Sequence, residues 1–525
     1  MPKALPRVTY SNVSADFAGV HALLDARISS FCKEMLGWTW SNHVGGINEA
    51  LGATYYAVSP IDTNVHLGSF HAADAGGVDR AVRSARAAFE YWGRLPWPER
   101  VTICRRFADE LKARKYDLAV ACLLEVGKSR MEAMGEAEEA IDLVRYYADE
   151  MEANEGYSRP LKRAFRQEAT SDLLRPIGVF AVIAPFNFPL ALSVNMITGA
   201  LITGNTVVYK PSQSAALTGL MLSDAVAAAG VPRHALNTIC GGAATGEALV
   251  RHAGVDGIAF TGSHQVGMTI LREVAAGRYN RPVIVEMGGK NPTYVTASAD
   301  LDAAAEGVMR SAFGLQGQKC SAGSKVYVHA AVKEVFLAKL LQLTASIKVG
   351  YPMDPGVFMG PLIDDKALAR FRQASAEAHE HGKVLAGGEV LTGGLYDQGA
   401  YVAPTIVDGV PPEHRINKEE LFLPFLSVLT FTDLAAAIAD GNDVIYGLTA
   451  GCYAQDKTEL ALFMDRAEAG VLYANRASGA TTGAWPGIQS FCGWKGSGVS
   501  GKGGLGPHYL AQFMREQSRT VWRSR

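Results

Sequence analysis

This sequence lacks an excess of either positive or negative charge. Its 525 residues include 50 Lys and Arg against 52 Asp and Glu, so the formal net charge is −2 at pH 7. A protein that binds nucleic acid would show a basic surplus, so the composition argues against that class. The longest apolar stretches are strand-sized, and none reaches the roughly 18 residues that a membrane span needs. The opening residues also lack a long apolar run, so we expect no secretory signal.

Paired cysteine motifs are absent too. The seven cysteines lie singly at positions 32, 104, 122, 240, 320, 452 and 492, without a CxxC pair or a Cys/His cluster. The sequence therefore predicts neither a disulfide framework nor a bound metal, and we expect a reducing, cytoplasmic compartment. No GxGxxG follows a predicted strand, so the ordinary dinucleotide-binding fingerprint is missing as well.

What the sequence does contain is a regular alternation of strands and helices. Four apolar runs are predicted strands, at 178–184, 206–209, 237–240 and 257–260. Helices are predicted between them, over 190–201 and up to residue 229. This order is typical of a parallel α/β sheet. A second α/β block is expected over 291–487, with a strand at 325–328, and a chain of this length needs about two or three domains.

The remaining segments are predicted from patterning alone. Residues 1–54 form a lead segment with helix-like patterning and no chemical motif. Amphipathic helices are predicted over 81–93 and 100–126, with prolines separating them, and another helix, rich in Glu, is predicted over 132–155. The polar stretch 159–172 is not expected in the core, and the glycine-rich stretch 493–506 is predicted to be loop.

Cys320 is the first candidate catalytic residue. It lies in a polar, glycine-flanked turn, Gly317-Gln318-Lys319-Cys320-Ser321, whereas a cysteine packed in a core usually has apolar neighbours. Glu286 lies 34 positions upstream (320 − 286) and opens the turn Glu286-Met287-Gly288-Gly289-Lys290. A cysteine nucleophile and a glutamate base together suit the formation and hydrolysis of a thioester.

Six motifs carry a family resemblance. In chain order they are Pro185-Phe186-Asn187-Phe188-Pro189, Lys210-Pro211-Ser212, Phe260-Thr261-Gly262-Ser263, the turns at Glu286 and Cys320, and Glu419-Glu420-Leu421-Phe422. With these motifs the chain resembles the NAD(P)-dependent aldehyde dehydrogenases from about residue 55 to its end. The resemblance implies an α/β aldehyde dehydrogenase fold, with a Rossmann-like cofactor domain, an α/β catalytic domain and a small β oligomerisation element.

The resemblance also implies a division of the chain. Residues 1–155 and 176–288 would form the cofactor-binding domain, with 1–54 as a helical lead segment, and 289–490 would form the catalytic domain. Residues 156–175 and 504–525 would form the oligomerisation element, in which a terminal strand at 518–522 pairs with a neighbouring subunit. We therefore expect a homodimer or a higher homo-oligomer.

The catalytic roles follow from the same resemblance. Cys320 would be the nucleophile, and its thiolate needs a pKa lowered by a helix N-terminus or a cation. Asn187 and the backbone N–H of Cys320 would stabilise the oxyanion. Glu286 would activate the water that hydrolyses the thioester, and Lys210 would also serve the site. The expected activity is oxidation of an aldehyde to a carboxylate through a cysteine thiohemiacetal and thioester.

A second set of residues resembles the family's cofactor contacts. They are Lys210, Ser212, Gln213, Gly262, Ser263, Gly267, Glu420 and Phe422. Gly262 and Gly267 fit a variant GxxxxG turn, with Ser263 meeting a pyrophosphate at a helix N-terminus. Gln213 stands where NAD-preferring members often carry Glu, and a neutral amide would not repel a 2′-phosphate, so the cofactor is NAD or NADP.

The resemblance implies a small-molecule aldehyde as the substrate. The branch that the chain most resembles is the Δ1-pyrroline-5-carboxylate (glutamate semialdehyde) dehydrogenases of proline catabolism. The residues that resemble the substrate-binding residues of this branch are Phe186, Ser321, Gly483, Ala484 and Phe491. Phe186 and Phe491 would sandwich the aliphatic chain. Thr482-Gly483-Ala484 would anchor a carboxylate with backbone N–H groups.

Three alternatives stay open at this point. Trp485 and Pro486 add bulk beside the anchor, so the substrate of the same scaffold would be a larger or aromatic aldehyde. A second alternative is a non-catalytic structural or binding protein on the same fold. A third is a hydrolase that uses Cys320 without redox chemistry.

Overall fold

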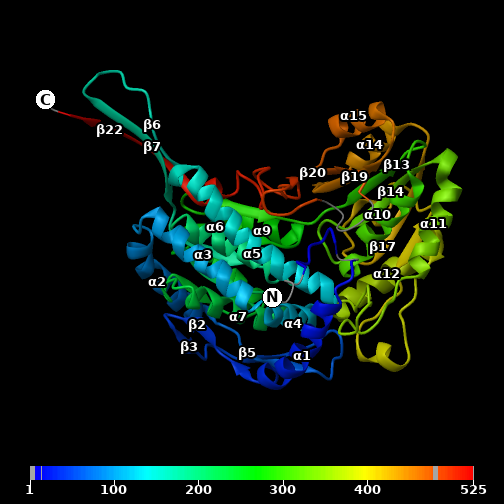
Figure 1. Cartoon of the computed structure of the whole chain (residues 1–525), viewed down its shortest axis with the longest axis horizontal. Helices are drawn as coiled ribbons and strands as arrows, with labels where there is room; N and C mark the ends of the chain where they lie inside the picture. Colours follow the sequence, from blue (N-terminus) through cyan, green and yellow to red (C-terminus); the bar gives the residue numbers. More distant parts are fainter. Residues whose placement is uncertain (1–5, 13–14, 477–482, 524–525) are drawn as a thin grey trace.

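The computed structural model describes residues 6–12, 15–476 and 483–523 (Figure 1). Two seven-stranded sheets, each with its own helices, lie beside each other, and a three-stranded element projects from the first of them. The mixed α/β architecture with parallel sheets that the sequence predicts is confirmed.

The first large sheet has the order β12-β11-β8-β9-β10-β2-β3. Its strands are β12 (Val283–Glu286), β11 (Gly257–Thr261), β8 (Val179–Ile183), β9 (Thr206–Lys210), β10 (Leu236–Thr238), β2 (Asn42–Val44) and β3 (Ile47–Glu49). The first five are parallel to one another, and β2 and β3 are antiparallel. Every residue of β8, β9 and β11 is buried, as expected for strands covered by helices on both faces.

Helices of this half cover the sheet, and several are capped by side chains. They are α2 (Ala75–Trp92), α3 (Trp97–Ala113), α4 (Lys115–Val126), α5 (Arg130–Ala153), α6 (Ala191–Ile202), α7 (Ala216–Ala228), α8 (Ala243–Arg251) and α9 (His264–Ala275). Asp74, Ser129 and Ser263 each accept a backbone N–H from the first turn. The single helix predicted over 100–126 is wrong, because the backbone at Arg114 leaves helical geometry (φ −102°, ψ 6°) and separates α3 from α4.

The lead segment is less helical than predicted. It contains α1 (Ala18–Met35), followed by β1 (Thr39–Trp40) and the β2–β3 hairpin. Gly45 and Gly46 have φ of 61° and 82°, the geometry of a tight turn that favours glycine, so the chain reverses and adds two strands to the sheet edge. β1 joins β4 (Thr54–Val58) and β5 (His66–His71) in a small separate sheet.

The second large sheet has the order β15-β16-β17-β14-β13-β19-β20. Its strands are β15 (Lys383–Ala386), β16 (Thr405–Asp408), β17 (Phe425–Phe431), β14 (Gly323–His329), β13 (Asn291–Val295), β19 (Thr449–Tyr453) and β20 (Val471–Ala474). Its helices are α10 (Leu301–Phe313), α11 (Lys333–Ala345), α12 (Asp365–His381), α13 (Arg415–Lys418), α14 (Leu434–Asn442) and α15 (Lys457–Arg466). Only β15 runs antiparallel to its neighbour.

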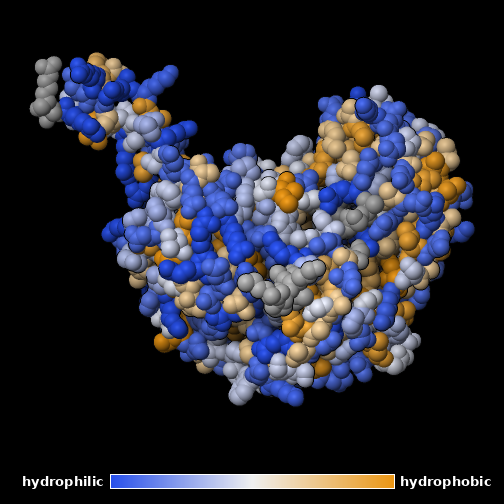
Figure 2. All heavy atoms as spheres, viewed as in Figure 1, coloured by the Kyte–Doolittle hydropathy of each residue, from blue (hydrophilic) through white to orange (hydrophobic). Residues whose placement is uncertain are grey.

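The projecting element consists of β6 (Ser158–Pro160), β7 (Glu168–Pro176) and β22 (Met514–Trp522). β7 and β22 are antiparallel over their full length, from Met514 opposite Pro176 to Trp522 opposite Glu168. Hydrophobic residues lie among hydrophilic ones on its surface (Figure 2). Phe165, Val521 and Trp522 of this element are exposed. Its role in oligomerisation stays a prediction.

In the predicted loop after Gly493, a two-residue strand, β21 (Trp494–Lys495), pairs with β18 (Tyr446–Gly447).

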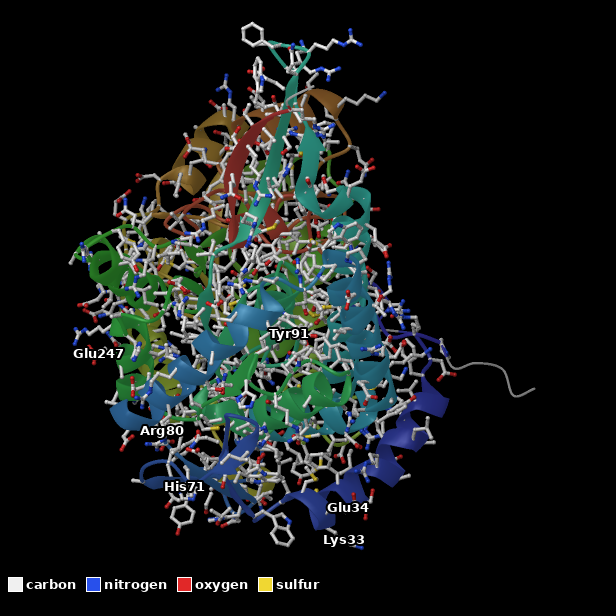
Figure 3. The ribbon with its side chains drawn as sticks, turned by 90° about the vertical axis from the view of Figure 1, so that its left-hand side faces the viewer. Lys33, Glu34, His71, Arg80, Tyr91 and Glu247 are labelled. Atoms are coloured by element: carbon white, nitrogen blue, oxygen red, sulfur yellow. The ribbon has the colours of Figure 1, made fainter. Side chains whose placement is uncertain are left out.

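The outer surface carries both signs of charge. Figure 3 labels Lys33 and Glu34 on α1, Arg80 on α2 and Glu247 on α8, in agreement with the near-zero net charge. Among the described helices none combines the length and the apolar character that crossing a membrane requires.

Candidate active site

One cavity of ≈ 710 Å³ brings together most of the predicted catalytic residues. From the first sheet it receives the segments that follow β8 and β11 and the last residue of β12, all at carboxyl ends of parallel strands, where such sheets usually bind ligands. From the second half it receives the loop before β14, with Cys320, and the loop before β17, with Glu420 and Phe422. Asn187, Glu286 and Cys320 therefore face a common space.

Cys320 lies in the loop between the short turn η3 (Gly314–Gly317) and β14. The side-chain amide of Asn291 donates to the carbonyl oxygens of Cys320 (2.7 Å) and Ala322 (2.8 Å), which holds this loop. Burial raises the pKa of the Cys320 thiol to about 12, and the carboxylates of Glu420 and Glu286 add to that rise. The predicted lowering of this pKa is therefore wrong for the chain by itself, because desolvation outweighs the opposing backbone N–H groups.

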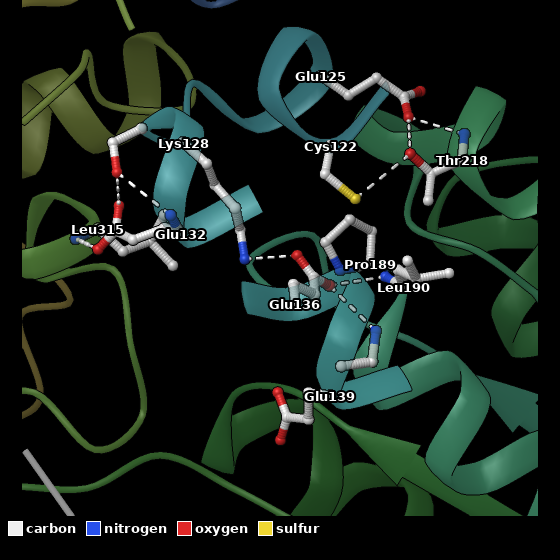
Figure 4. Close-up of polar contacts among 12 residues, drawn as sticks. Cys122, Glu125, Lys128, Glu132, Glu136, Glu139, Pro189, Leu190, Thr218 and Leu315 are labelled. Atoms are coloured by element: carbon white, nitrogen blue, oxygen red, sulfur yellow. Dashed lines mark hydrogen bonds and ion pairs between the residues drawn. The ribbon is translucent and has the colours of Figure 1, made fainter. Parts of the chain in front are cut away.

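The loop before Cys320 is held in an unusual backbone conformation. Leu315 and Gln316 both have left-handed φ values, 50° and 55°, which cost about 1 kcal/mol or more each. Two hydrogen bonds from the first half hold them: Leu315 N donates to Glu132 (2.8 Å, Figure 4), and Gln316 Nε2 donates to the carbonyl of Gly127 (2.8 Å). The nucleophile loop is thus positioned by α5 and by the residue that ends α4.

Glu286 is the last residue of β12, and its Oε2 atom is buried without a hydrogen-bond partner among the described residues. Burial raises the pKa of this carboxyl well above its usual range, and the backbone N–H of Gly493 opposes the rise. An unpartnered buried carboxyl oxygen is costly to a fold, so its presence beside Cys320 indicates a chemical role. A raised pKa suits a base that must work near neutral pH.

The Gly288-Gly289 turn after Glu286 lets Glu420 approach closely. Gly289 N donates to Glu420 Oε1 at 3.0 Å, and a Cβ on Gly288 would collide with the Glu420 carboxylate. Burial raises the pKa of Glu420 to about 7. Phe422, with a left-handed φ of 58°, turns back so that its ring meets Phe186 edge to face at 5.9 Å.

The residues predicted to bind a cofactor divide into two groups. Ser212, Gly262, Ser263, Glu420 and Phe422 line the cavity, whereas Lys210, Gln213 and Gly267 do not. Lys210 Nζ donates instead to the carbonyls of Pro211 (3.0 Å) and Gly241 (3.2 Å), and burial lowers its pKa to about 8. A Cβ on Gly267 would collide with the Met287 side chain, so this glycine serves close packing.

The predicted substrate residues Phe186, Ser321, Ala484 and Phe491 line the cavity, and Gly483 does not. Gly483 N donates to Gln489 Oε1 at 2.8 Å, so this N–H already has a partner. Thr482, the first residue of the predicted carboxylate anchor, lies outside the described residues. The anchor therefore remains a prediction that the Gly483 contact does not favour.

Comparison with known proteins agrees with this geometry. Residues 48–518 match the model of the aldehyde dehydrogenase family. This chain belongs to the aldehyde dehydrogenase family. It is 35% identical to 1-pyrroline-5-carboxylate dehydrogenase 1 of Halalkalibacterium halodurans, over 87% of each chain. It is also 35% identical to the alpha-ketoglutaric semialdehyde dehydrogenase of Bacillus subtilis, over 84% of this chain and 90% of that one. The crystal structure of 1-pyrroline-5-carboxylate dehydrogenase from Thermus with bound NAD superimposes with a TM-score of 0.91, at 30% identity, over 99% of this chain and 100% of that one.

Membership makes this protein an oxidoreductase that acts on aldehydes, which excludes the non-catalytic alternative. Within the described part of the chain, no group of three or more His, Cys, Asp or Glu side chains is arranged to hold a metal ion.

A buried ion pair supports the site of this aldehyde dehydrogenase. Lys128 Nζ lies 2.6 Å from Glu136 Oε2, and both side chains are 0% exposed (Figure 4). Glu136 Oε1 accepts the backbone N–H groups of Leu190 (2.8 Å) and Ala191 (3.0 Å), at the start of α6. Lys128 Nζ also lies 3.7 Å from the centre of the Phe188 ring. The pair thereby fixes the loop that carries Asn187.

Two residues of the site were missed by sequence reasoning. Asn291, which holds the Cys320 loop, belongs to none of the motifs identified in the sequence. Tyr10, from the lead segment, lines the cavity although no motif surrounds it. A polar residue at the first position of a buried strand is a signal that could have marked Asn291, whereas nothing in the sequence marks Tyr10.

The pKa of Cys320 should fall when Glu420 loses its charge. In the cofactor-free enzyme, thiolate alkylation by iodoacetamide should rise with pH through pH 10 without a plateau, because the thiol pKa is about 12. Glu420→Gln removes the carboxylate that raises it most, so alkylation at pH 9 should accelerate by at least about 3-fold, at roughly 10-fold per pKa unit. Peptide mapping by mass spectrometry would follow Cys320 separately from Cys32 and Cys492, which are also partly exposed.

The matched control is Glu419→Gln, which removes the neighbouring carboxylate, 63% exposed and facing Arg415. Its alkylation rate should equal that of the wild type. An equal effect of both substitutions would show that bulk charge and not the Glu420 contact sets the pKa.

Proposed function

We propose that this aldehyde dehydrogenase oxidises a semialdehyde that carries a carboxylate at its other end, foremost L-glutamate 5-semialdehyde, which forms from 1-pyrroline-5-carboxylate. The observation that carries the proposal is the single cavity in which Cys320 and Glu286 lie with the aromatic pair Phe186 and Phe491. The names of the relatives support the same substrate class, because two of them act on five-carbon semialdehydes.

The chain's own groups divide the chemistry into two stages. In the first, the Cys320 thiol gives its proton to bulk water, and the sulfur forms a bond to the aldehyde carbon. The carbonyl oxygen becomes an oxyanion, for which the Asn187 amide and the Cys320 N–H are the donors, and removing one such donor typically costs about 3–4 kcal/mol. A bound oxidised nicotinamide supplies the acceptor for the hydride that leaves this carbon.

In the second stage a water molecule replaces sulfur. Glu286 takes a proton from the water, the new C–O bond forms, and the C–S bond breaks to release the carboxylate and Cys320. The raised pKa of Glu286 fits this step, because it makes the carboxylate a stronger base toward the water, and the proton that it takes then passes to the Cys320 sulfur.

The residues present fit a nicotinamide dinucleotide. Ser263 caps α9 and lies on the cavity, so the N-terminal N–H groups of this helix are placed for a pyrophosphate. Glu420 offers carboxylate oxygens to ribose hydroxyls. Lys210 has one of its three N–H donors left beyond its two carbonyl partners. Gln213 is exposed and neutral, which is compatible with NAD and NADP.

We further propose the domain division 1–155 with 176–288 for the cofactor, 289–490 for catalysis, and 156–175 with 504–525 for assembly into a homodimer or larger homo-oligomer. The exposed Phe165, Val521 and Trp522 on the projecting element support the last part, since exposed aromatic groups on a paired sheet favour burial against a second copy. A monomeric mass in light scattering would contradict it.

Steady-state kinetics with a set of aldehydes tests the substrate. We expect 1-pyrroline-5-carboxylate or alpha-ketoglutaric semialdehyde to exceed propanal and benzaldehyde in kcat/KM by at least about 100-fold, since a matched polar end group contributes several kcal/mol. NAD and NADP would be compared side by side by the absorbance of the reduced cofactor. A preference for benzaldehyde or another uncharged aldehyde would refute the carboxylated substrate and leave the chemistry of Cys320 in place.

A further inference from the structure

The lead segment reaches into the active site of the enzyme. Residues 7–12 cross α5, where Arg7 pairs with Glu138 (3.1 Å) and Asp142 (2.7 Å), and Val8 is 1% exposed. The segment is braced internally, because Thr9 N donates to Asn12 Oδ1 (2.7 Å) and Asn12 Nδ2 donates to the Arg7 carbonyl (2.9 Å). We call residues 7–12 the strap.

Tyr10 is the part of the strap that lines the catalytic cavity. Its ring meets Phe188 and Trp485 edge to face, at 6.1 Å and 5.6 Å between ring centres. Its hydroxyl donates to Glu139 Oε2 at 2.7 Å. A Cβ on Gly135 would lie 3.0 Å from the ring, so the glycine inside α5 leaves the room that this ring occupies.

The strap also contacts the segment on both sides of the predicted carboxylate anchor. Arg476 donates to Ser11 Oγ at 3.4 Å. On the other side, Trp485 Nε1 donates to Asp142 Oδ2 at 2.9 Å, the same carboxylate that Arg7 engages. The strap, α5 and the Trp485 loop are therefore joined through Asp142.

We propose that Tyr10 forms the far wall of the aldehyde site and sets the length of the chain that fits between this wall and Cys320. The inference rests on the proposed function, because it assigns the tail of the aldehyde to the end of the cavity lined by Tyr10. The Tyr10 ring is held by two aromatic neighbours and a hydrogen bond, so it cannot easily move aside. It therefore selects aldehydes by their shape. Among the described residues, the hydrogen bond and ring contacts of Tyr10 are to Glu139, Phe188 and Trp485 and not to Cys320 or Glu286, so its role is in specificity.

Kinetics with straight-chain aldehydes from propanal to octanal tests this role. Tyr10→Ala should raise the ratio of kcat/KM for octanal to kcat/KM for propanal by at least about 10-fold, mainly through a lower KM for octanal, since each methylene that gains room in an apolar pocket is worth about 10-fold or more. Tyr10→Phe keeps the ring and should keep the wild-type length preference. Tyr56→Ala removes a tyrosine that is 72% exposed on β4 and serves as the matched control.

An octanal-to-propanal ratio that stays within about 2-fold of the wild type in Tyr10→Ala would overturn the proposal. An equal loss for every aldehyde would do the same, because it would indicate a structural role only. Failure of the proposed function would be seen separately, as a lack of preference of the wild type for 1-pyrroline-5-carboxylate. The octanal-to-propanal ratio of kcat/KM could still be measured in that case. Protection of Cys320 from iodoacetamide by propanoate and by octanoate gives the same comparison without turnover.

Discussion

Cys320→Ala is expected to lower aldehyde oxidation by at least about 10⁴-fold, because among the described residues no other cysteine lines the cavity to form the thioester. The loop around this position is held by Asn291 and by the contacts of Leu315 and Gln316, all made through the backbone of the loop or through side chains other than Cys320. The substitution should therefore leave the fold intact. The measurement is the formation of reduced cofactor at saturating aldehyde, with circular dichroism as the check on folding.

Glu286→Gln is the matched variant that separates the two stages. The amide is of similar size, so the cavity should keep its shape, yet it cannot take the proton from water. We expect about one equivalent of reduced cofactor per site in the first turnover, followed by a steady-state rate lower by about 10²–10⁴-fold. Full multiple turnover by either variant would refute the assignment of both residues.

Lys128→Met is expected to destabilise the fold by about 3–5 kcal/mol, the range for breaking a fully buried ion pair. The substitution leaves the Glu136 carboxylate in a site that is 0% exposed, with the Leu190 and Ala191 N–H groups as its remaining partners. The result would be seen as a lower urea midpoint of unfolding, compared at one protein concentration.

The double variant Lys128→Met/Glu136→Gln tests whether the unpaired charge of Glu136 causes the loss of stability. Its neutral amide oxygen can still accept the two N–H groups of α6, so a large part of the lost stability should return. Arg94→Met is the exposed control, because Arg94 and Glu90 pair at 2.7 Å with side chains that are 74% and 66% exposed. Its effect should stay within about 1 kcal/mol. An equal loss in the double variant would show that packing of the lysine stem, and not its charge, carries the effect.

The parts of the fold that sequence reasoning predicted well are those with a local signal. β8, β9 and β11 are buried on both faces, so their sequences are continuous apolar runs that can be recognised locally. Boundaries set by tertiary contacts were predicted less well. The break at Arg114 has no proline or glycine to mark it, and the strands β1 to β3 are too short for periodicity to show.

For the site, the sequence by itself determined which groups are available: a cysteine, a glutamate, an asparagine and a helix start at Ser263, each in a recognisable local setting. Only the tertiary structure decided how these groups behave. Burial raises the pKa of Cys320 and of Glu286, and desolvation depends on atoms from both halves of the chain. Tyr10 reaches Glu139 across 129 positions, and Gly483 N–H is taken by Gln489, because the paths of the loops, which no local pattern encodes, place these partners together.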